Sequence, residues 1–205
     1  MLRARVRGVS LALAFAGVLF GGGLARAQDS TTVRSEAAEE RRTPTGPFAL
    51  VVDLSERELY VMRGDEVERT YQVAIGKPEH PTPRGSFNVR RLIWNPRWVP
   101  PDAAWARNRR ARAPGDPRNP MGRVKIFFRA PDYYIHGTHQ EDSLGQAESH
   151  GCIRMRNADV IELAQMVMEN GGARRSPSWF QQVINRVRST AEVGLSSPVT
   201  LRIRE

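Results

Sequence analysis

Residues 48–76 have the sequence FALVVDLSERELYVMRGDEVERTYQVAIG, and this stretch decides the fold class. It contains three runs rich in β-branched and aromatic residues, at 48–54, 58–63 and 67–76, separated by short polar turns. Similar runs predict further strands at 86–93, 123–129, 133–136 and 198–203. The sequence therefore predicts a mainly β sandwich or barrel.

One helix is predicted soon after the only cysteine, Cys152. Asn157 is a suitable N-terminal cap, Asp159 suits the first turn, and Gly171-Gly172 ends the helix. Its apolar face consists of Val160, Ile161, Leu163, Ala164, Val167 and Met168. We therefore expect Cys152 in a tight loop that leads into this helix, where backbone N–H groups can stabilise an oxyanion.

An extra helix is predicted near the C-terminus, over residues 176–189. Ser176 is a good cap, and Pro177 suits the first helical position because its fixed φ matches a helix. The apolar side of this helix consists of Trp179, Phe180, Val183, Ile184 and Val187. We expect that side to pack against the domain rather than against a partner.

Residues 1–27 have the three parts of a secretory signal peptide. These are the basic residues Arg3, Arg5 and Arg7, an apolar run over 9–20, and Ala25-Arg26-Ala27 as the cleavage site. A retained anchor is the alternative, but the Gly21-Gly22-Gly23 break leaves the run short of the roughly 20 residues that span a bilayer. We expect cleavage after Ala27, no stable membrane span afterwards, and export to the periplasm or cell envelope.

The next segment, residues 28–46, is rich in Ser, Thr, Glu, Arg and Pro and predicts a disordered linker before a domain over 47–205. The formal net charge is +9, and removal of residues 1–27 takes away four arginines and no acids, which leaves +5. Export and this smaller charge argue against nucleic acid as a partner. Arginines in the long stretch 95–120 can form either a substrate-binding surface or a solvated charge run.

Cys152 lies in the stretch Ser149-His150-Gly151-Cys152-Ile153-Arg154-Met155. A lone buried thiol that acts as a small hydrophobe is one interpretation. However, an imidazole and a guanidinium flank this thiol at two residues' distance, and cationic surroundings lower a thiol's pKa. Gly151 allows a positive φ or a close backbone approach. We therefore expect Cys152 to be a nucleophile.

A nucleophilic thiol needs a base, and residues 133–139 predict a strand that ends in His136 before a glycine turn. His136 is expected to accept the thiol proton and to pass a proton to the leaving amine. A histidine that only hydrogen-bonds a turn is the alternative. The cysteine motif downstream favours the base.

These residues resemble a known family. His136-Gly137-Thr138, followed by Ser149–Met155 with Asn157 and Asp159, is similar to the L,D-transpeptidase catalytic domain, also called the YkuD domain. Other segments that look like the family's recurring ones, in the expected order, are Gly76-Lys77, Thr82–Phe87, Asn95-Pro96, Trp98 and Asn119–Gly122. The extra helix over 176–189 departs from the family pattern, which puts the acceptor specificity in doubt but not the chemistry.

The resemblance implies an L,D-transpeptidase-like β-sandwich or barrel with Cys152 as nucleophile and His136 as proton acceptor and donor. It implies an oxyanion hole made by the backbone N–H groups of Gly151 and Cys152. His150 is expected to support the nucleophile electrostatically or to contact substrate.

The remaining candidate residues belong to the substrate and oxyanion region. Arg154 is expected to bind a stem carboxylate through its planar fork. Ser149 is expected to fix the loop by hydrogen bonding, and Gly137 lies beside the base.

The resemblance also implies the reaction. The cysteine attacks the amide after the diamino acid of a peptidoglycan tetrapeptide stem, releases the terminal D-alanine, and an amine then resolves the acyl-enzyme. The acceptor is a second stem, giving a 3→3 cross-link, a lysine of a wall-anchored protein, or a free D-amino acid. The family needs no metal or organic cofactor.

Three other functions compete with this interpretation. A cysteine hydrolase would use the same residues with water as the acceptor. A zinc site would use His136, His139, His150 and Cys152, although two ligands separated by one glycine crowd a tetrahedral ion. A non-catalytic envelope protein would need no cysteine at all.

Overall fold

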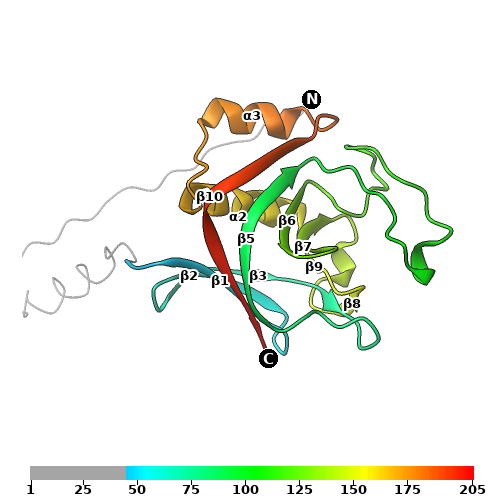
Figure 1. The fold of residues 1–205 in the computed structure, drawn as a ribbon, viewed down its shortest axis with the longest axis horizontal. Helices are drawn as coiled ribbons and strands as arrows, with labels where there is room; N and C mark the ends of the chain where they lie inside the picture. The colour runs from blue at the N-terminus through cyan, green and yellow to red at the C-terminus, as the bar shows by residue number, and fades with distance from the viewer. Residues whose placement is uncertain (1–44) are drawn as a thin grey trace, which may run out of the picture. The chain divides into compact units, whose positions relative to one another are not determined.

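The computed structural model describes residues 45–205 (Figure 1). The predicted signal peptide lies outside the described residues, as does the predicted linker except for Thr45 and Gly46. Within the described range, no helix combines the length and the apolar character that crossing a bilayer requires.

The described residues form a mainly β domain, which confirms the predicted fold class. Eight strands form one curled sheet in the order β3-β2-β1-β10-β5-β6-β7-β9. Their bounds are β1 (Phe48–Asp53), β2 (Glu58–Arg63), β3 (Glu66–Gln72), β5 (Gly85–Trp94), β6 (Val124–Arg129), β7 (Tyr133–Thr138), β9 (Ile153–Arg156) and β10 (Ala191–Arg204). A small second sheet pairs β4 (Ile75–Gly76) with β8 (Ala147–Ser149).

The two edges of the large sheet approach each other. Ala74, just after β3, exchanges two backbone hydrogen bonds of 2.9 and 2.8 Å with Arg154 of β9. Because β3 and β9 are the two edge strands, this pairing nearly closes the sheet into a barrel. It also holds the backbone of Arg154 between β7 and the segment after β3.

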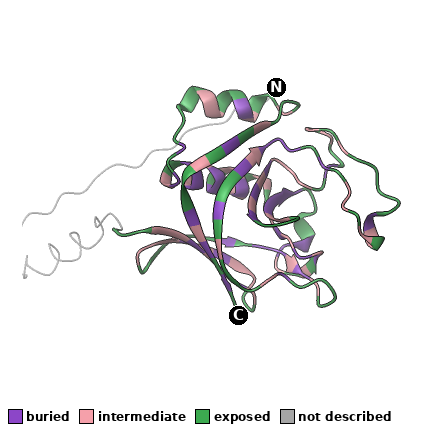
Figure 2. Cartoon of the chain, in the orientation of Figure 1, coloured by how far each residue is buried: buried purple, intermediate pink, exposed green. Residues whose placement is uncertain are grey.

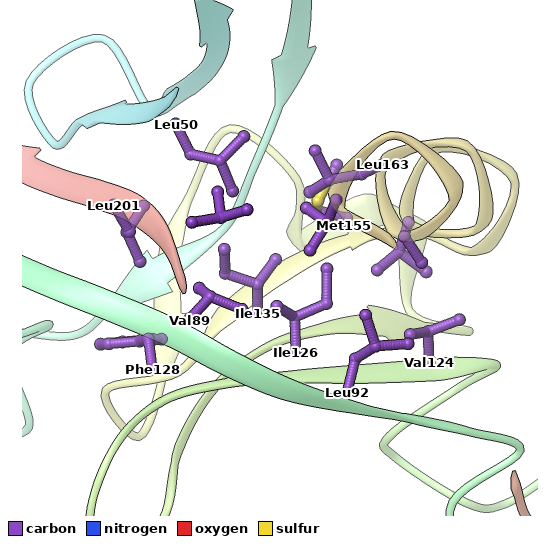
Figure 3. Packing of buried hydrophobic residues seen from close by; sticks show 14 of the residues in the cluster. Leu50, Val89, Leu92, Val124, Ile126, Phe128, Ile135, Met155, Leu163 and Leu201 are labelled. Carbon is purple, nitrogen blue, oxygen red and sulfur yellow. The ribbon is translucent and has the colours of Figure 1, made fainter. Parts of the chain in front are cut away.

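The apolar core lies between the curled sheet and the helix α2 (Asn157–Asn170). Figure 3 shows core side chains from both, among them Leu50, Ile126, Ile135 and Leu163, all fully buried. Burial of one such aliphatic side chain contributes about 1.5–3 kcal/mol. Alternation along each strand therefore decides which side chains face the core and which face away from it.

Helix α2 ends before Gly171, as predicted, but its start differs from the prediction in two ways. Four residues of β9 separate Cys152 from the helix, because Ile153 and Met155 are buried there while the backbone pairs with β7. Asn157 does not cap the helix: Oδ1 accepts from the Arg123 N–H and Nδ2 donates to the Thr138 carbonyl, both at 2.9 Å. The side chain thus satisfies backbone groups of β7 and of the segment that enters β6.

Helix α3 (Pro177–Asn185) confirms the extra helix, although it ends four residues earlier than predicted. The Ser176 hydroxyl accepts from the N–H of Trp179 at 3.2 Å, as expected of a cap. The Trp179 ring packs edge-on against Trp94 with centroids 6.0 Å apart, so the apolar side faces the domain. At this end of the helix, Asn95 Nδ2 donates to the carbonyls of Val183 at 2.8 Å and Arg186 at 3.2 Å.

Three of the predicted strands differ from the prediction by more than one residue. The run 67–76 divides into β3 and β4. Strand β7 continues past His136 to Thr138, because Gly137 stays extended and pairs with Met155 instead of turning. Strand β10 begins at 191 rather than 198, and an irregularity between Gly194 and Val199 accommodates Pro198, which has no N–H to donate.

The segment between β5 and β6 is long and largely outside the core (Figure 2). It contains one short 3-10 helix, Ala104–Ala106, and a backbone pairing between Trp98 and Arg112. Asn119 braces its two ends, donating to the carbonyls of Pro96 at 2.8 Å and Ala113 at 3.1 Å. This braced segment forms one side of the cavity described next.

Candidate active site

Three neighbouring strands build one wall of the candidate site. Lys125 of β6 lies opposite His136 of β7, which in turn lies opposite Arg154 of β9. The adjacent Ile135 and Ile153 are fully buried in the core. Since successive side chains of a strand point to opposite faces, Lys125, His136 and Arg154 form a row on the face away from the core.

This row and Cys152 border an open cavity of about 1270 Å³. The braced segment between β5 and β6 lines the opposite side, with Trp98, Trp105 and several arginines. Six cationic side chains but only Asp102 and Asp132 as acids lie along the cavity; the cations are Arg109, Arg110, Arg112, Arg118, Lys125 and Arg154. The cavity therefore favours an anionic ligand.

The hydrogen bonding of His136 fixes its tautomer. Nδ1 lies 2.8 Å from the Gly137 carbonyl oxygen, and because a carbonyl only accepts, Nδ1 carries the hydrogen. Burial lowers the pKa of His136 to about 4, and the charges of Arg154 and Lys125 act in the same direction. The imidazole is thus neutral at pH 7, and its Nε2 is left as an acceptor.

Cys152 is half-buried, and its Sγ donates to the Asp132 carbonyl at 3.3 Å. Burial raises the pKa of the thiol to about 11, although the Tyr134 N–H and the charge of Arg154 act to lower it. Desolvation therefore outweighs the cationic neighbours, which do act to lower this pKa as the sequence suggests. Thiol and imidazole are both neutral at pH 7.

The loop before Cys152 is held by Ser149, which is fully buried. Its hydroxyl accepts from the Gly151 N–H at 3.0 Å and donates to the Cys152 carbonyl. Gly151 has φ +100, and a Cβ there would lie 2.8 Å from the Tyr133 ring, so only glycine fits without strain. These contacts fix the direction in which the thiol leaves the backbone.

His150 contacts the loop on the other side of the cavity. Its ring stacks on Trp105 with centroids 4.0 Å apart and 16° between the planes, and His80 lies 5.0 Å away at a tilt. Burial lowers the pKa of His150, and the nearby charge of Lys77 acts in the same direction. His150 therefore connects the cysteine loop to the 3-10 helix of the braced segment.

Five of the seven predicted site residues line the cavity, and the two glycines lie behind its wall. Ser149, His150, Cys152, Arg154 and His136 line the cavity. Gly137 and Gly151 support it from behind: a Cβ on Gly137 would lie 2.3 Å from Asn157 Oδ1, and its carbonyl orients the base.

Sequence reasoning missed Lys125 and Trp105 as parts of the site. The alternation of charged and apolar residues in Val124-Lys125-Ile126 shows that the lysine faces away from the core. Only the pairing with β7 brings it beside His136. Trp105 carries no local signal, because its contact with His150 spans 45 residues of chain.

The residues of the zinc hypothesis are not gathered around one point. Within residues 45–205, no three His, Cys, Asp or Glu side chains are grouped so that they could hold a metal ion. His139 is exposed, whereas His136 is buried with its Nδ1 engaged by a carbonyl.

A mainly β domain with a neutral imidazole and a thiol on one cationic cavity wall is the arrangement expected of an acyl-transfer enzyme. A family model described as YkuD, L,D-transpeptidase catalytic domain, matches residues 47–174. The chain belongs to the L,D-transpeptidase family.

Known relatives agree with this membership. The chain is 36% identical over 127 residues to YkuD of Bacillus licheniformis, covering 62% of this chain and 64% of that protein. It is 36% identical over 133 residues to YqjB of Bacillus subtilis, covering 62% of this chain and 70% of that one. The alignment thus spans less than two thirds of the first relative.

A solved structure shares the fold. The catalytic domain from an E. faecium L,D-transpeptidase matches with a TM-score of 0.50 at 17% identity, covering 79% of this chain and 100% of that domain.

Proposed function

We propose that this protein is an exported L,D-transpeptidase that acts on peptidoglycan tetrapeptide stems through an acyl-enzyme on Cys152. The observation that carries the proposal is the tautomer of His136. Its Nδ1 donates to the Gly137 carbonyl, which leaves Nε2 as an acceptor on the cavity wall that also bears the thiol. A neutral acceptor on the same cavity wall as a neutral thiol is a suitable starting state for general-base catalysis.

Acylation transfers one proton twice. As Sγ attacks the carbonyl carbon of the scissile amide, the thiol proton moves to Nε2 of His136, and the carbonyl becomes an oxyanion. When the tetrahedral intermediate collapses, the C–N bond breaks and Nε2 gives the proton to the departing amine. The products of this half-reaction are a thioester on Cys152 and the released terminal amino acid.

Deacylation repeats the sequence with an incoming amine. Nε2 takes a proton from the attacking amine, a new amide forms, and the C–S bond breaks. The proton on Nε2 then returns to the departing sulfur, which restores the thiol. His136 therefore acts as base and acid in turn without a metal or organic cofactor.

The oxyanion is assigned mainly to the backbone N–H of Cys152. The N–H of Gly151 already donates to Ser149 Oγ, so it contributes only when substrate displaces that bond. Donors that point at the developing charge supply the largest single contribution in most acyl transfers. Ser149 and Gly151 are in this proposal residues that position the loop.

The cationic cavity supports a substrate with several carboxylates, as stem peptides have. The arginines of the braced segment, Arg109, Arg110 and Arg112, face this cavity and are proposed to contact the stem or neighbouring anionic wall polymer. The acceptor is proposed to be the amine of a second stem, a lysine of a wall-anchored protein or a D-amino acid. Water as acceptor would make the same site a hydrolase.

The proposed layout of the chain follows the expectations from sequence. Residues 1–27 direct export and are removed, residues 28–46 form a linker, and residues 47–205 form the catalytic domain in the periplasm or elsewhere in the envelope. Intact mass of protein recovered from an expressing cell's envelope fraction tests this: a chain that begins at Gln28 supports it, and an uncleaved cytoplasmic chain contradicts it.

The reaction is tested with muropeptides that carry tetrapeptide stems. Incubation with the purified protein, followed by mass spectrometry, should give dimers that lack one terminal D-alanine. Tripeptides without dimers would instead indicate a hydrolase. Cys152→Ala should give neither product, while the exposed Arg202→Met serves as a control that keeps activity; unchanged muropeptides with the natural chain would overturn the proposal.

A further inference from the structure

The row of Lys125, His136 and Arg154 contains two cations that the proposed mechanism does not use. We propose that Lys125 and Arg154 form a carboxylate-binding subsite that selects stem peptides with a free carboxylate next to the scissile amide. This inference rests on the proposed function, whose substrate recognition it specifies. Lys125 is the new residue in this subsite, because the sequence motif around Cys152 contains Arg154 but not Lys125.

The two cations flank the base from opposite sides. Lys125 pairs with His136 across β6 and β7, and Arg154 pairs with it across β7 and β9. All three line the cavity. Since adjacent strands lie about 4.8 Å apart, the two cationic side chains begin about 10 Å apart with the imidazole between them.

Neither cation has an acidic partner. Among residues 45–205, no carboxylate lies within ion-pair distance of the Lys125 ammonium or the Arg154 guanidinium, whereas other arginines are paired. The nearby Arg123 and Arg156, by contrast, donate to Asn95 and Glu141, both at 3.0 Å. Asp132 is the acid with the largest effect on Lys125, but it makes no ion pair with it.

Both cations are held in partly desolvated positions. Lys125 Nζ lies 4.1 Å from the centroid of the Tyr134 ring, whose hydroxyl donates to Asp132 at 3.2 Å. Burial lowers the pKa of both groups and outweighs the acids that act in the opposite direction, Asp132 on Lys125 and Glu148 on Arg154. Neither acid is thus close enough to serve as a full counter-ion. A bound carboxylate would supply that counter-ion.

The two groups suit complementary parts of a carboxylate. The guanidinium of Arg154 offers a planar fork for two oxygens, and the ammonium of Lys125 is a compact point charge. Arg154 lies two residues after Cys152, and both cations line the cavity that contains the thiol, so a carboxylate bound there lies near the reacting bond. The carboxylate of the terminal residue meets this condition in every tetrapeptide stem, and a diamino acid that carries a side-chain carboxylate would offer a second one.

The experiment compares three synthetic tetrapeptide stems: one with both carboxylates free, one with the terminal carboxylate amidated, and one with the diamino acid's side-chain carboxylate amidated. The measured quantity is kcat/KM for release of the terminal residue. The natural chain should discriminate against one amidated stem by about 10- to 150-fold, since hydrogen bonds to charged groups contribute about 1.5–3 kcal/mol. The disfavoured stem identifies which carboxylate is bound.

Lys125→Met should reduce kcat/KM for the free stem while leaving that for the disfavoured amide nearly unchanged, so the preference falls at least severalfold. Lys125→Arg keeps the positive charge and should restore part of the preference for the free stem. Arg202→Met removes one positive charge outside the cavity and should keep the full preference. Thermal melts of all three variants separate this effect from misfolding.

Two results would overturn the subsite. One is a natural chain that turns over all three stems equally. The other is a Lys125→Met variant that loses the same factor on each stem, which indicates a structural role. If no stem is turned over, the proposed function fails, and calorimetric binding of the same stems to Cys152→Ala with and without Lys125→Met still decides the subsite.

Discussion

The two faces of strands β6, β7 and β9 have opposite characters, one apolar and buried and the other polar and open to the cavity. On one face, Ile126, Ile135 and Met155 are fully buried against α2 and the other strands. On the other face, Lys125, His136 and Arg154 form a polar row along the cavity. The backbone is shared, and only the alternation of side chains separates stability from chemistry.

The positions of Lys125, His136 and Arg154 in the polar row are set by strands rather than by loops. The apolar face fixes the strands, and the strands fix the spacing of the polar row through backbone hydrogen bonds. Substitutions on the core face should therefore change stability first, and those on the cavity face should change activity first.

Removal of the thiol should have the largest effect. Cys152→Ala is expected to lower acyl transfer by at least about 10⁴-fold, because no other side chain supplies the nucleophile. A carbapenem should acylate the natural chain at Cys152, since its strained carbonyl mimics the scissile amide, and intact mass should show no adduct on the variant. A melting temperature close to that of the natural chain is expected; an active variant would refute the role of the thiol.

A core-face substitution next to the base should reverse this pattern. Ile135→Ala removes a fully buried side chain and should lower the free energy of unfolding by about 2–5 kcal/mol. Chemical denaturation measures this loss, and kcat of the remaining folded protein should change little. A large loss of kcat at unchanged stability would show that the two faces are not separable.

The buried base should make stability depend on pH. The pKa of His136 is lowered to about 4 in the folded protein, below its ordinary value of 6.5. Between pH 6.5 and 4, the unfolded chain therefore binds a proton that the folded chain does not. As the pH is lowered through this window, the free energy of unfolding should fall by up to about 1.4 kcal/mol per pH unit.

Denaturant titrations of the natural chain and of His136→Gln measure this contribution as the difference in their pH slopes. Equal slopes would contradict a neutral buried imidazole. The acylation rate should also stay level between pH 6 and 8, because the neutral base is already present throughout that range.

The smallest effect is expected across the cavity, at the contact of Trp105 with His150. Stacked aromatic pairs contribute about 0.5–1.5 kcal/mol, so Trp105→Ala should raise KM by about 2- to 13-fold with kcat less affected. Trp105→Phe should recover most of this loss. A fall in kcat alone would instead indicate that the braced segment acts on the chemical step.

Local patterns in the sequence sufficed for most of the strands, for both helices and for the residues around Cys152. They failed where a distant partner competes for a residue. Asn157 has the composition of a cap but binds the backbone at Arg123 and Thr138, and Gly137 has the composition of a turn but stays in a strand. In both cases the deciding hydrogen bond comes from a segment far away in the chain.

Local sequence patterns were enough to predict the mainly β class, the helix after the cysteine loop, the extra C-terminal helix and the candidate pair Cys152 and His136. Periodicity, turn residues and a short motif are local properties, so the chain carries them before it folds. Tertiary packing, by contrast, desolvates both groups, brings Lys125 into line with His136 and Arg154, and stacks Trp105 on His150. Burial and strand register set these features, and both exist only after distant segments have packed together.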